Sequence, residues 1–423
     1  MLGRPGFLGR VGLGLTLVVL VSCNQIDARP VAGEASEPSP ELLASAESGD
    51  VLAQLDVGLF YEQAALEAED AERARSEAEA VRWLTLAAEQ ENAEAQAALG
   101  VMLATAEGQG RNVAEAKRWL SRASQAGQAS AWFMLGEIAQ KGDVEPPNPV
   151  LAVSHWKKAR ALDHVGALHR LGEAHEQGLG VERDVEAAIA LYREAADEGY
   201  ALSQYRLAVI FDEGQVTDRD AIEAVKYYRL AAEQGHAPAQ AQLGYLYARG
   251  DGVVQRFDEA LRFSQMAAEQ GDADGCNNLA VLYLKGLGVE QSFEEALRWY
   301  RLAAQRHHPG AQNMLGTIYL TGQGVDVDPS EAEHWWRMAA DQGYAAAQYN
   351  LGGMFSRELS STLTRDEALD WLGRAADQGH RSAARELAEL EAIVAAGARV
   401  PETVPTGESV PAKQAPDAGR ATL

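Results

Sequence analysis

The chain contains only two cysteines among 423 residues, Cys23 and Cys276, so no disulfide framework holds its fold together. Cys23 stands at the end of an apolar N-terminal segment, which leaves Cys276 as the only thiol expected in the folded part. One thiol cannot form an internal disulfide bond. We expect Cys276 to be a small buried residue, with a reactive or metal-binding thiol as the alternative.

Positive charge is also scarce, since 37 lysines and arginines face 62 aspartates and glutamates, for a net charge of -25 at pH 7. A chain of this charge is not expected to bind nucleic acid through its overall field. It is equally unsuited to lie flat on an anionic membrane, so membrane contact should come through an attached lipid. The charge favours either simple solubility or a basic partner.

Sequence signatures of catalysis are missing as well. There is no Gly-x-Ser-x-Gly elbow, no His-Glu-x-x-His pair and no pair of carboxylates in an apolar setting. Four Gly-x-Gly segments each follow a predicted helix, and they recur at multiples of one fixed interval along the chain. They are therefore interpreted as turns and not as phosphate-binding loops. We therefore expect no enzymatic activity and no cofactor.

The histidines do not form a metal signature either. Four of them recur 72 residues apart, namely His164, His236, His308 and His380. Helices in contact lie about 8 to 10 Å apart, whereas zinc ligands lie about 2.1 Å from the metal, so residues this far apart along a helical array cannot converge. They are interpreted as polar residues at helix starts. Four histidines also lie close together in the sequence: His155, His164, His169 and His175. Their spacing matches no known zinc-binding motif.

What the sequence does contain is a repeat. A leucine followed by glycine or alanine returns every 36 residues without a change of phase, at Leu99, Leu135, Leu171, Leu207, Leu243, Leu279, Leu315, Leu351 and Leu387. A second pattern at the same interval places alanines four residues after a large side chain, as in Trp299 and Ala303. A fixed period of this length is typical of solenoids built from helical pairs.

Turn and cap residues agree with two helices per repeat. Glycines such as Gly250 and Gly252 lie between the two predicted helices, where they permit positive φ angles. Capping-box spacing, as in Thr364 with Glu367, precedes the second helix. The predicted fold is an all-α, right-handed α-solenoid of antiparallel helix pairs, with about nine 36-residue repeats and a C-terminal capping helix near residues 381–396.

The best-kept repeat runs from Ala237 through Gly252-Val253 to Gly271 and resembles the Sel-one-like repeat family, whose repeats are related to tetratricopeptide repeats. The resemblance covers roughly residues 46–396. Proteins of that family are mostly adaptors and scaffolds of multiprotein assemblies. The resemblance therefore implies a protein-binding role for this chain.

The N-terminus predicts export. Arg4 and Arg10 flank a short apolar run that ends in Leu-Val-Ser-Cys, too short for a membrane-spanning helix. The ending resembles a bacterial lipobox, which implies cleavage before Cys23 and lipid attachment to it, with an ordinary signal peptide as the alternative. Asn24 follows, which in Gram-negative lipoproteins favours the outer membrane.

Four segments are thus predicted: a lipoprotein signal peptide at 1–22, a flexible tether at 23–44, the helical solenoid at 45–396 and a disordered proline-rich tail at 397–423. The protein is expected in the cell envelope, lipid-anchored through Cys23 and facing the periplasm from the outer membrane.

Functional residues should lie at the positions of the repeat where the residue type varies from one repeat to the next. In similar solenoids the first helix of each pair lines a concave groove for partners. The positions one and two before and two after the leucine vary in type, whereas core positions do not. Tyrosine and arginine offer contact area, and asparagine can pair with a peptide backbone. The predicted partner-binding groove is Arg170, Tyr205, Arg206, Tyr245, Asn277, Asn278, Asn313 and Tyr349.

These observations predict a lipid-anchored envelope scaffold whose groove binds proteins or extended peptides, helping to assemble a complex for secretion or polysaccharide export. Two alternatives stay open, namely binding of glycan by groove aromatics and modification of cell-wall material. Unselected drift of groove positions would give the same variability.

Overall fold

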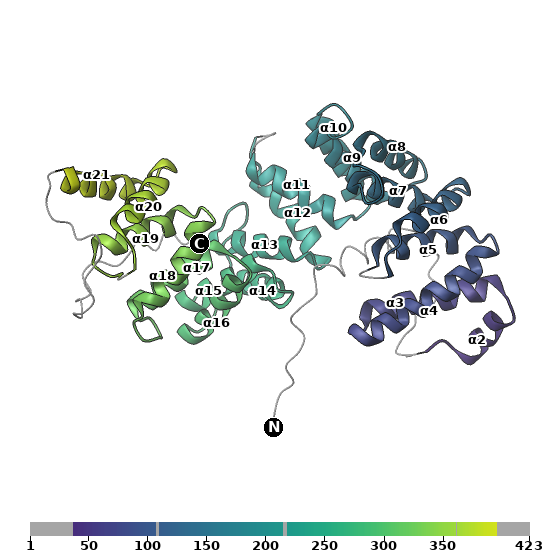
Figure 1. The fold of residues 1–423 in the computed structure, drawn as a ribbon, viewed down its shortest axis with the longest axis horizontal. Coiled ribbons are helices and arrows are strands. Elements are labelled where there is room, and N and C mark those ends of the chain that lie inside the picture. Colours follow the sequence, from purple (N-terminus) through teal and green to yellow (C-terminus); the bar gives the residue numbers. More distant parts are fainter. Residues whose placement is uncertain (1–36, 107–109, 215–217, 361, 396–423) are drawn as a thin grey trace, which may run out of the picture. The chain divides into compact units, whose positions relative to one another are not determined.

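The computed structural model describes residues 37–106, 110–214, 218–360 and 362–395, and within these ranges it consists of twenty helices and no strands (Figure 1). The chain divides into two compact units, one up to Leu207 and the other from Ala208 onward. Within the described ranges no helix combines the length and the apolar character needed to cross a bilayer.

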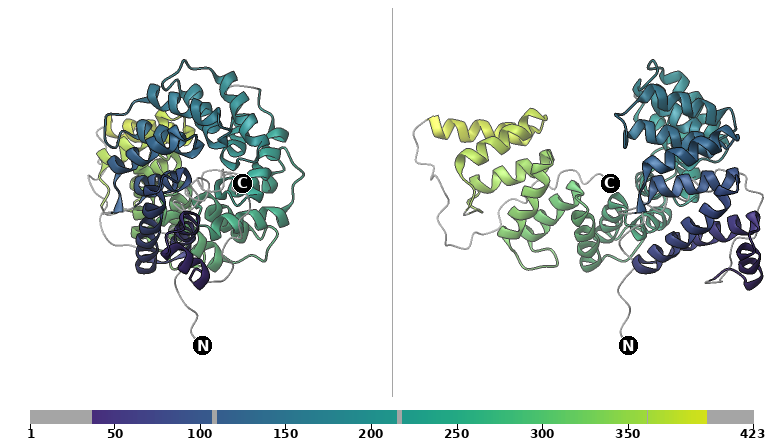
Figure 2. Two further views of the ribbon diagram at one scale, coloured as in Figure 1. Left: turned by 90° about the vertical axis from the view of Figure 1, so that its right-hand side faces the viewer. Right: turned by 45° about the vertical axis from the view of Figure 1, so that its right-hand side comes forward.

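Nine repeats each contain two antiparallel helices, which we call the A helix and the B helix (Figures 1 and 2). The A helices are α3 (Val51–Glu67), α5 (Ala93–Thr105), α7 (Ala129–Lys141), α9 (Val165–Gln177), α11 (Ala201–Glu213), α13 (Ala237–Arg249), α15 (Ala273–Lys285), α17 (Pro309–Thr321) and α19 (Ala345–Ser356). The B helices are α4 (Asp70–Glu89), α6 (Val113–Gln125), α8 (Pro149–Arg160), α10 (Val185–Asp197), α12 (Ala221–Glu233), α14 (Phe257–Glu269), α16 (Phe293–Gln305), α18 (Pro329–Asp341) and α20 (Arg365–Asp377). The predicted all-α solenoid of about nine helix pairs is confirmed.

The ends of the array are single helices. α21 (Arg381–Ala395) closes the C-terminal end, close to its predicted range. At the other end α2 (Pro40–Glu47) was not predicted: Ser39 caps it through the amide of Leu42, and Ala46 is buried. The tether prediction is therefore wrong from residue 40 onward. The predicted signal peptide, Cys23 and the tail at 397–423 lie outside the described residues.

The repeating leucine and the glycine after it form one contact site. Leu243 and Leu315 are fully buried. A methyl group added at Gly316 would lie 2.5 Å from the Trp336 ring, and one at Gly136 would lie 2.3 Å from Trp156. The glycine thus lets a bulky side chain of the B helix pack directly on the backbone of its A helix.

The second glycine of each Gly-x-Gly turn joins successive repeats. Gly252 has φ +68°, and a Cβ atom there would lie 2.2 Å from the carbonyl oxygen of Ala221, at the start of the preceding B helix. Gly288 contacts Phe257 in the same way. These segments are turns between packed helices, as predicted.

A buried glutamine near the start of the A helix links two B helices, and we call this contact the glutamine bridge. The Nε2 of Gln312 donates to the carbonyl of Ala304 in the preceding repeat at 3.1 Å, and its Oε1 accepts from Gln342 at 2.7 Å. Further bridges of this kind centre on Gln54, Gln240 and Gln348. Each bridge satisfies a backbone carbonyl at the end of a helix.

Cys276 occupies the bridge position of its own repeat. It is fully buried, its sulfur lies 3.9 Å from the carbonyl oxygen of Ala268, and burial raises its pKa to about 11. Arg306, at the position of Gln342 in the next repeat, donates instead to the carbonyl of Gly271. The prediction of a small buried residue is confirmed, and the raised pKa does not favour a reactive thiolate.

The histidines spaced 72 residues apart lie at helix starts, as predicted. The Nδ1 atoms of His236, His308 and His380 accept hydrogen bonds from backbone amides three residues on, at 3.2, 2.9 and 3.2 Å. His164 differs, because its ring stacks on Phe133 with centroids 4.4 Å apart.

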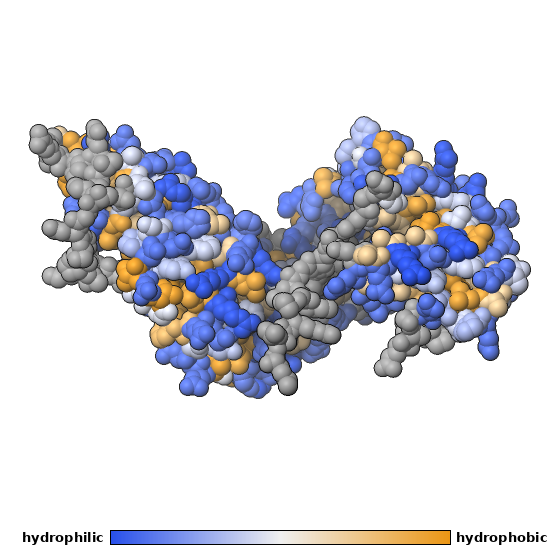
Figure 3. Space-filling model, turned by 60° about the horizontal axis from the view of Figure 1, so that its bottom comes forward, coloured by the Kyte–Doolittle hydropathy of each residue, from blue (hydrophilic) through white to orange (hydrophobic). Residues whose placement is uncertain are grey.

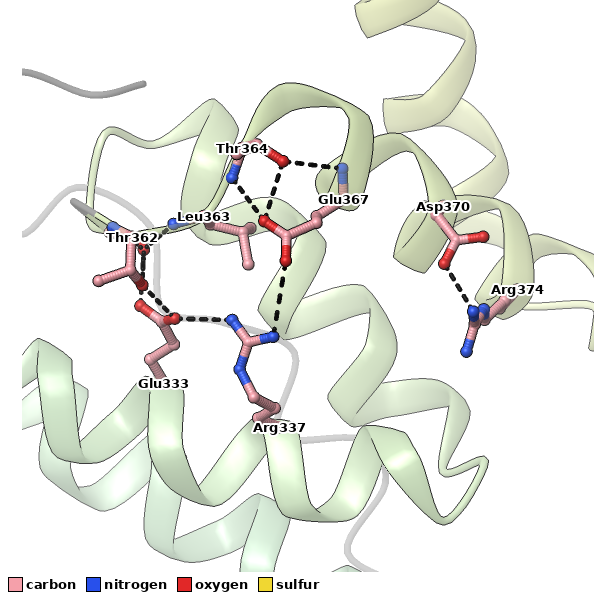
Figure 4. Close-up of polar contacts among 9 residues, drawn as sticks. Glu333, Arg337, Thr362, Leu363, Thr364, Glu367, Asp370 and Arg374 are labelled. Atoms are coloured by element: carbon pink, nitrogen blue, oxygen red, sulfur yellow. Dashed lines mark hydrogen bonds and ion pairs between the residues drawn. The ribbon is translucent and has the colours of Figure 1, made fainter. Parts of the chain in front are cut away.

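The turn between α19 and α20 lacks the Gly-x-Gly pattern and is held by side chains (Figure 4). Ser360 and Thr362 donate to the two carboxylate oxygens of Glu333 on α18, at 2.6 and 2.5 Å. Thr364 and Glu367 form the predicted capping box. Hydroxyl-to-carboxylate bonds thus replace the glycine contact of the other turns.

Substitution of Gln312 by alanine should lower the free energy of unfolding by about 1–3 kcal/mol, because a buried carbonyl and its neighbouring amide lose their partner. Gln265→Ala is the matched control, since the Gln265 side chain is exposed and bonds only Glu269. Denaturant unfolding followed by circular dichroism measures both. Equal effects for the two variants would contradict the structural role of the bridge.

The stability of the array should fall in acid. Burial lowers the pKa of His236 from 6.5 to about 4, so the unfolded chain takes up a proton first as the pH drops below 6.5. The loss should reach about 3 kcal/mol near pH 4 and be absent above pH 7. His236→Asn keeps a capping oxygen but does not titrate. Its unfolding midpoint should therefore change less between pH 7 and pH 4.5, and an unchanged pH dependence would refute the assignment.

Candidate functional site

One pocket of about 340 Å³ gathers four of the eight predicted groove residues, and we call it the amide pocket. It lies on the A-helix side of three successive repeats in the unit from Ala208 onward. Its lining is Gln242 and Tyr245 of α13; Asp274, Asn277, Asn278 and Val281 of α15; His308, Pro309, Gly310, Asn313 and Met314 at α17; and Tyr344 before α19.

The repeat explains why these side chains meet. Seven lining residues stand one or two positions from the core leucine of their A helix: Gln242, Tyr245, Asn277, Asn278, Val281, Asn313 and Met314. The other five stand at the start of an A helix or just before it: Asp274, His308, Pro309, Gly310 and Tyr344. α13 and α15 are in contact, and the amides of Asn278 on α15 and Asn350 on α19 each bond the A helix before their own, so these positions on successive A helices become neighbours. Asp274 is four residues before Asn278 and therefore shares its helix face.

Two of the predicted residues are interior and not surface. Asn278 is 7% exposed and its amide donates to the carbonyl of Ala241 at 3.0 Å. Asn313 is 1% exposed and its side-chain oxygen accepts from Asn350, also at 3.0 Å. The prediction that they offer a contact surface is corrected: they form the floor of the pocket and tie neighbouring A helices together.

Asn277 and Tyr245 are only half-buried, so they are the predicted residues that a partner can reach here. Arg249 donates to the Tyr245 hydroxyl, and its guanidinium lies 5.4 Å from the ring centroid. Arg249, one helical turn after Tyr245, thus holds the tyrosine ring in place.

A hydrogen bond between His308 and Asp274 forms one edge of the pocket. Because the His308 Nδ1 accepts from a backbone amide, the neutral ring carries its proton on Nε2, which lies 3.1 Å from Asp274. The hydrogen bond from His308 holds the pKa of Asp274 below its usual value. The sequence predicted His308 only as a residue at a helix start, and it did not indicate Asp274, Gln242 or Tyr344. Asp274 could have been found, because it lies four residues before the predicted groove residue Asn278 and so shares its helix face.

Arg170 lies elsewhere, in the unit up to Leu207, on a pocket of about 600 Å³. Its guanidinium donates to both carboxylate oxygens of Glu137, at 3.0 and 2.7 Å, and to Glu173 at 2.7 Å. Burial raises the pKa of Glu137, while Arg170 opposes that shift. All three of its nitrogens are thus engaged within the chain.

The other predicted residues also have internal contacts. Arg206 donates to Glu176 from its Nε at 3.0 Å, and Tyr205 is half-buried. Tyr349 stacks on His380 with ring centroids 4.6 Å apart, and its hydroxyl accepts from Arg357 at 3.1 Å. Tyr205, Arg206 and Tyr349 do not line the amide pocket. Within the described residues no group of histidine, cysteine or carboxylate side chains is arranged to hold a metal ion.

Comparison with known protein families accounts for the repeats. The Sel1 repeat model matches nine consecutive segments, at residues 51–92, 93–128, 129–164, 165–200, 201–236, 237–272, 273–308, 309–344 and 345–380. The chain belongs to the Sel1 repeat family. Its repeat boundaries fall between the B helix of one pair and the A helix of the next.

Two solved structures are similar to this Sel1 repeat array. One is c5321, described as a protective antigen of uropathogenic Escherichia coli with an SLR fold; it is 28% identical, with a TM-score of 0.65 over 84% of this chain and 74% of that one. The other is a Sel1 repeat protein from Oxalobacter formigenes, 29% identical, with a TM-score of 0.54 over 58% of this chain and 96% of that one. No curated protein matches significantly.

The family gives a general function. Sel1 repeat solenoids are interaction scaffolds for proteins and are generally not catalytic. On the face of the molecule drawn in Figure 3, apolar side chains form small patches separated by hydrophilic ones. A partner would meet a mixed surface there, so the specific contacts should come from positions such as those of the amide pocket.

Proposed function

We propose that the chain is a lipid-anchored scaffold of the cell envelope that holds an extended segment of a partner protein at the amide pocket. The pocket is the observation that carries this proposal. Amide side chains such as Asn277 and Gln242 both donate and accept hydrogen bonds, as a peptide backbone does. Tyr245 adds a fixed aromatic surface of the kind that dominates protein interfaces.

The pocket is small and its floor is rigid. A volume of about 340 Å³ suits a few residues of an extended chain and not a folded domain. The asparagines of the floor are already bonded within the protein, so a bound segment does not have to order them. Binding would then depend on the accessible rim, chiefly Asn277, Tyr245 and Asp274.

Envelope location is part of the same proposal and rests on the N-terminal sequence. The basic residues, the short apolar run and the Leu-Val-Ser-Cys ending support lipidation at Cys23, with outer-membrane attachment facing the periplasm. The likeness to a protein described as a protective antigen is consistent with export. A scaffold so placed could help to assemble a secretion or polysaccharide-export complex.

Glycan binding is the second candidate. Planar polar groups beside an aromatic ring, here Asn277, Asp274 and Tyr245, can also bond the hydroxyls of a sugar. Titration of the purified protein with peptidoglycan fragments, followed by tyrosine and tryptophan fluorescence, separates this candidate from peptide binding.

A photoreactive benzoylphenylalanine introduced at Asn277 should crosslink a discrete protein in the native envelope. The matched control carries the same group at Arg298 on α16, whose side chain is 64% exposed and lies outside the amide pocket. Tyr245→Ala should lower the yield of the adduct at position 277. Equal adducts at the two positions, or none at position 277, would reject the pocket as the partner site.

Cys23→Ser should move the protein from the membrane fraction to the soluble fraction, because the lipid would have no attachment site. Cys276→Ser is the control, since this cysteine is buried in the array and should not affect fractionation. Immunoblotting of the two fractions measures both variants. Retention of Cys23→Ser in the membrane would exclude lipid anchoring at this residue.

A further inference from the structure

α8 differs from the other B helices on its solvent side. Among the described residues it is the one B helix without an acidic side chain, whereas every other carries at least one. Its last turn instead contains Lys157, Lys158 and Arg160. In a chain with a net charge of -25, this helix is a local exception.

Aliphatic side chains accompany these cations. Val150 is 67% exposed, Leu151 is 39% exposed, and Leu162, directly after the helix, is 41% exposed. Their spacing places them with Lys157 and Lys158 on one stripe along the helix. We call these five residues the α8 stripe.

The cations of the stripe are available for an outside partner. Among the described residues neither Lys157 nor Lys158 forms an ion pair with a carboxylate, and both are exposed. Lys158 lies 3.9 Å from the centroid of the Trp132 ring on α7. Arg118 and Arg122 of α6, the preceding B helix, are also exposed.

The first turn of α8 carries no acidic residue, whereas the first turns of α6, α10, α12, α14, α16, α18 and α20 each carry at least one. In α14 and α16 two acidic residues occupy the first turn, where they complement the positive end of the helix dipole. At the corresponding positions α8 has the exposed residues Val150 and Leu151, which gain nothing from that dipole and lie open to solvent. Such local departures without an internal benefit are typical of functional surfaces.

We propose that the α8 stripe docks on the surface of an anionic phospholipid bilayer, with its aliphatic side chains in the interface and its lysines against headgroup phosphates. Basic residues combined with exposed aliphatic ones, beside a tryptophan, are typical of interfacial helices. An acidic protein would match the lysines but would not account for the aliphatic residues. This proposal revises, for α8 alone, the expectation that membrane contact comes only through an attached lipid. The overall negative charge does not prevent local docking, because at 0.1 M salt it is screened over about 10 Å.

The test uses residues 24–423, which keep every described helix and lack the lipid, so that binding is independent of Cys23. Sedimentation with vesicles of phosphatidylcholine and phosphatidylglycerol in equal parts should show binding that vesicles of phosphatidylcholine alone do not support. The double variant Lys157→Gln, Lys158→Gln should lower the partition coefficient by about tenfold or more. The double variant Val150→Ser, Leu151→Ser should also lower the partition coefficient, although it leaves the net charge unchanged.

The control variant Arg262→Gln, Arg298→Gln removes the same charge from two other B helices, at side chains that are 58% and 64% exposed. It should bind as the parent does, and circular dichroism confirms folding of all variants. Equal weakening by both charge variants would overturn the proposal, because total charge would then explain the binding. Failure of the parent to prefer anionic vesicles would overturn it as well, whether or not the amide pocket binds a peptide.

Discussion

In most repeats the array depends on close contact between the glycine after the repeat leucine and a large side chain of the B helix. Trp156, Tyr192 and Trp336 pack so tightly on Gly136, Gly172 and Gly316 that no methyl group fits between them. This contact fixes the distance between the two helices of a pair. A single pair cannot bury both of its faces, so each pair is stable only beside its neighbours.

Glutamine bridges extend that constraint from one pair to the next. The buried side chain of Gln240, for example, donates to a carbonyl at the end of the B helix of the preceding repeat. It also accepts a hydrogen bond from Gln270, at the end of the B helix of its own repeat. The two bonds together set the register of successive repeats. Where Cys276 breaks the pattern, Arg306 restores a bond to the preceding repeat by another route. In that repeat a bond to the preceding repeat is thus kept without the glutamine.

The sequence allowed the repeats, turns and caps to be predicted because each depends on local chemistry repeated every 36 residues. It did not reveal which varying positions are covered by a neighbouring repeat. Asn278 and Asn313 lie on the predicted helix face, but their amides are used between A helices. Arg170 likewise has an acidic partner 33 residues away, on a different helix, that no local pattern indicates. Helix α2 was missed because eight residues are too few for a clear period.

Function in such an array must come from positions that the stacking leaves unconstrained. In the proposed function the amide pocket offers such positions only at its rim, on α13 and α15, above floor asparagines that the stacking already holds. The α8 stripe uses them on a B helix, where the absence of acidic residues matters because all the other B helices carry them. Since each repeat keeps its core leucine and a small residue after it, neither surface requires a change in that contact. One repeat can therefore acquire a contact of its own while its neighbours keep the array folded.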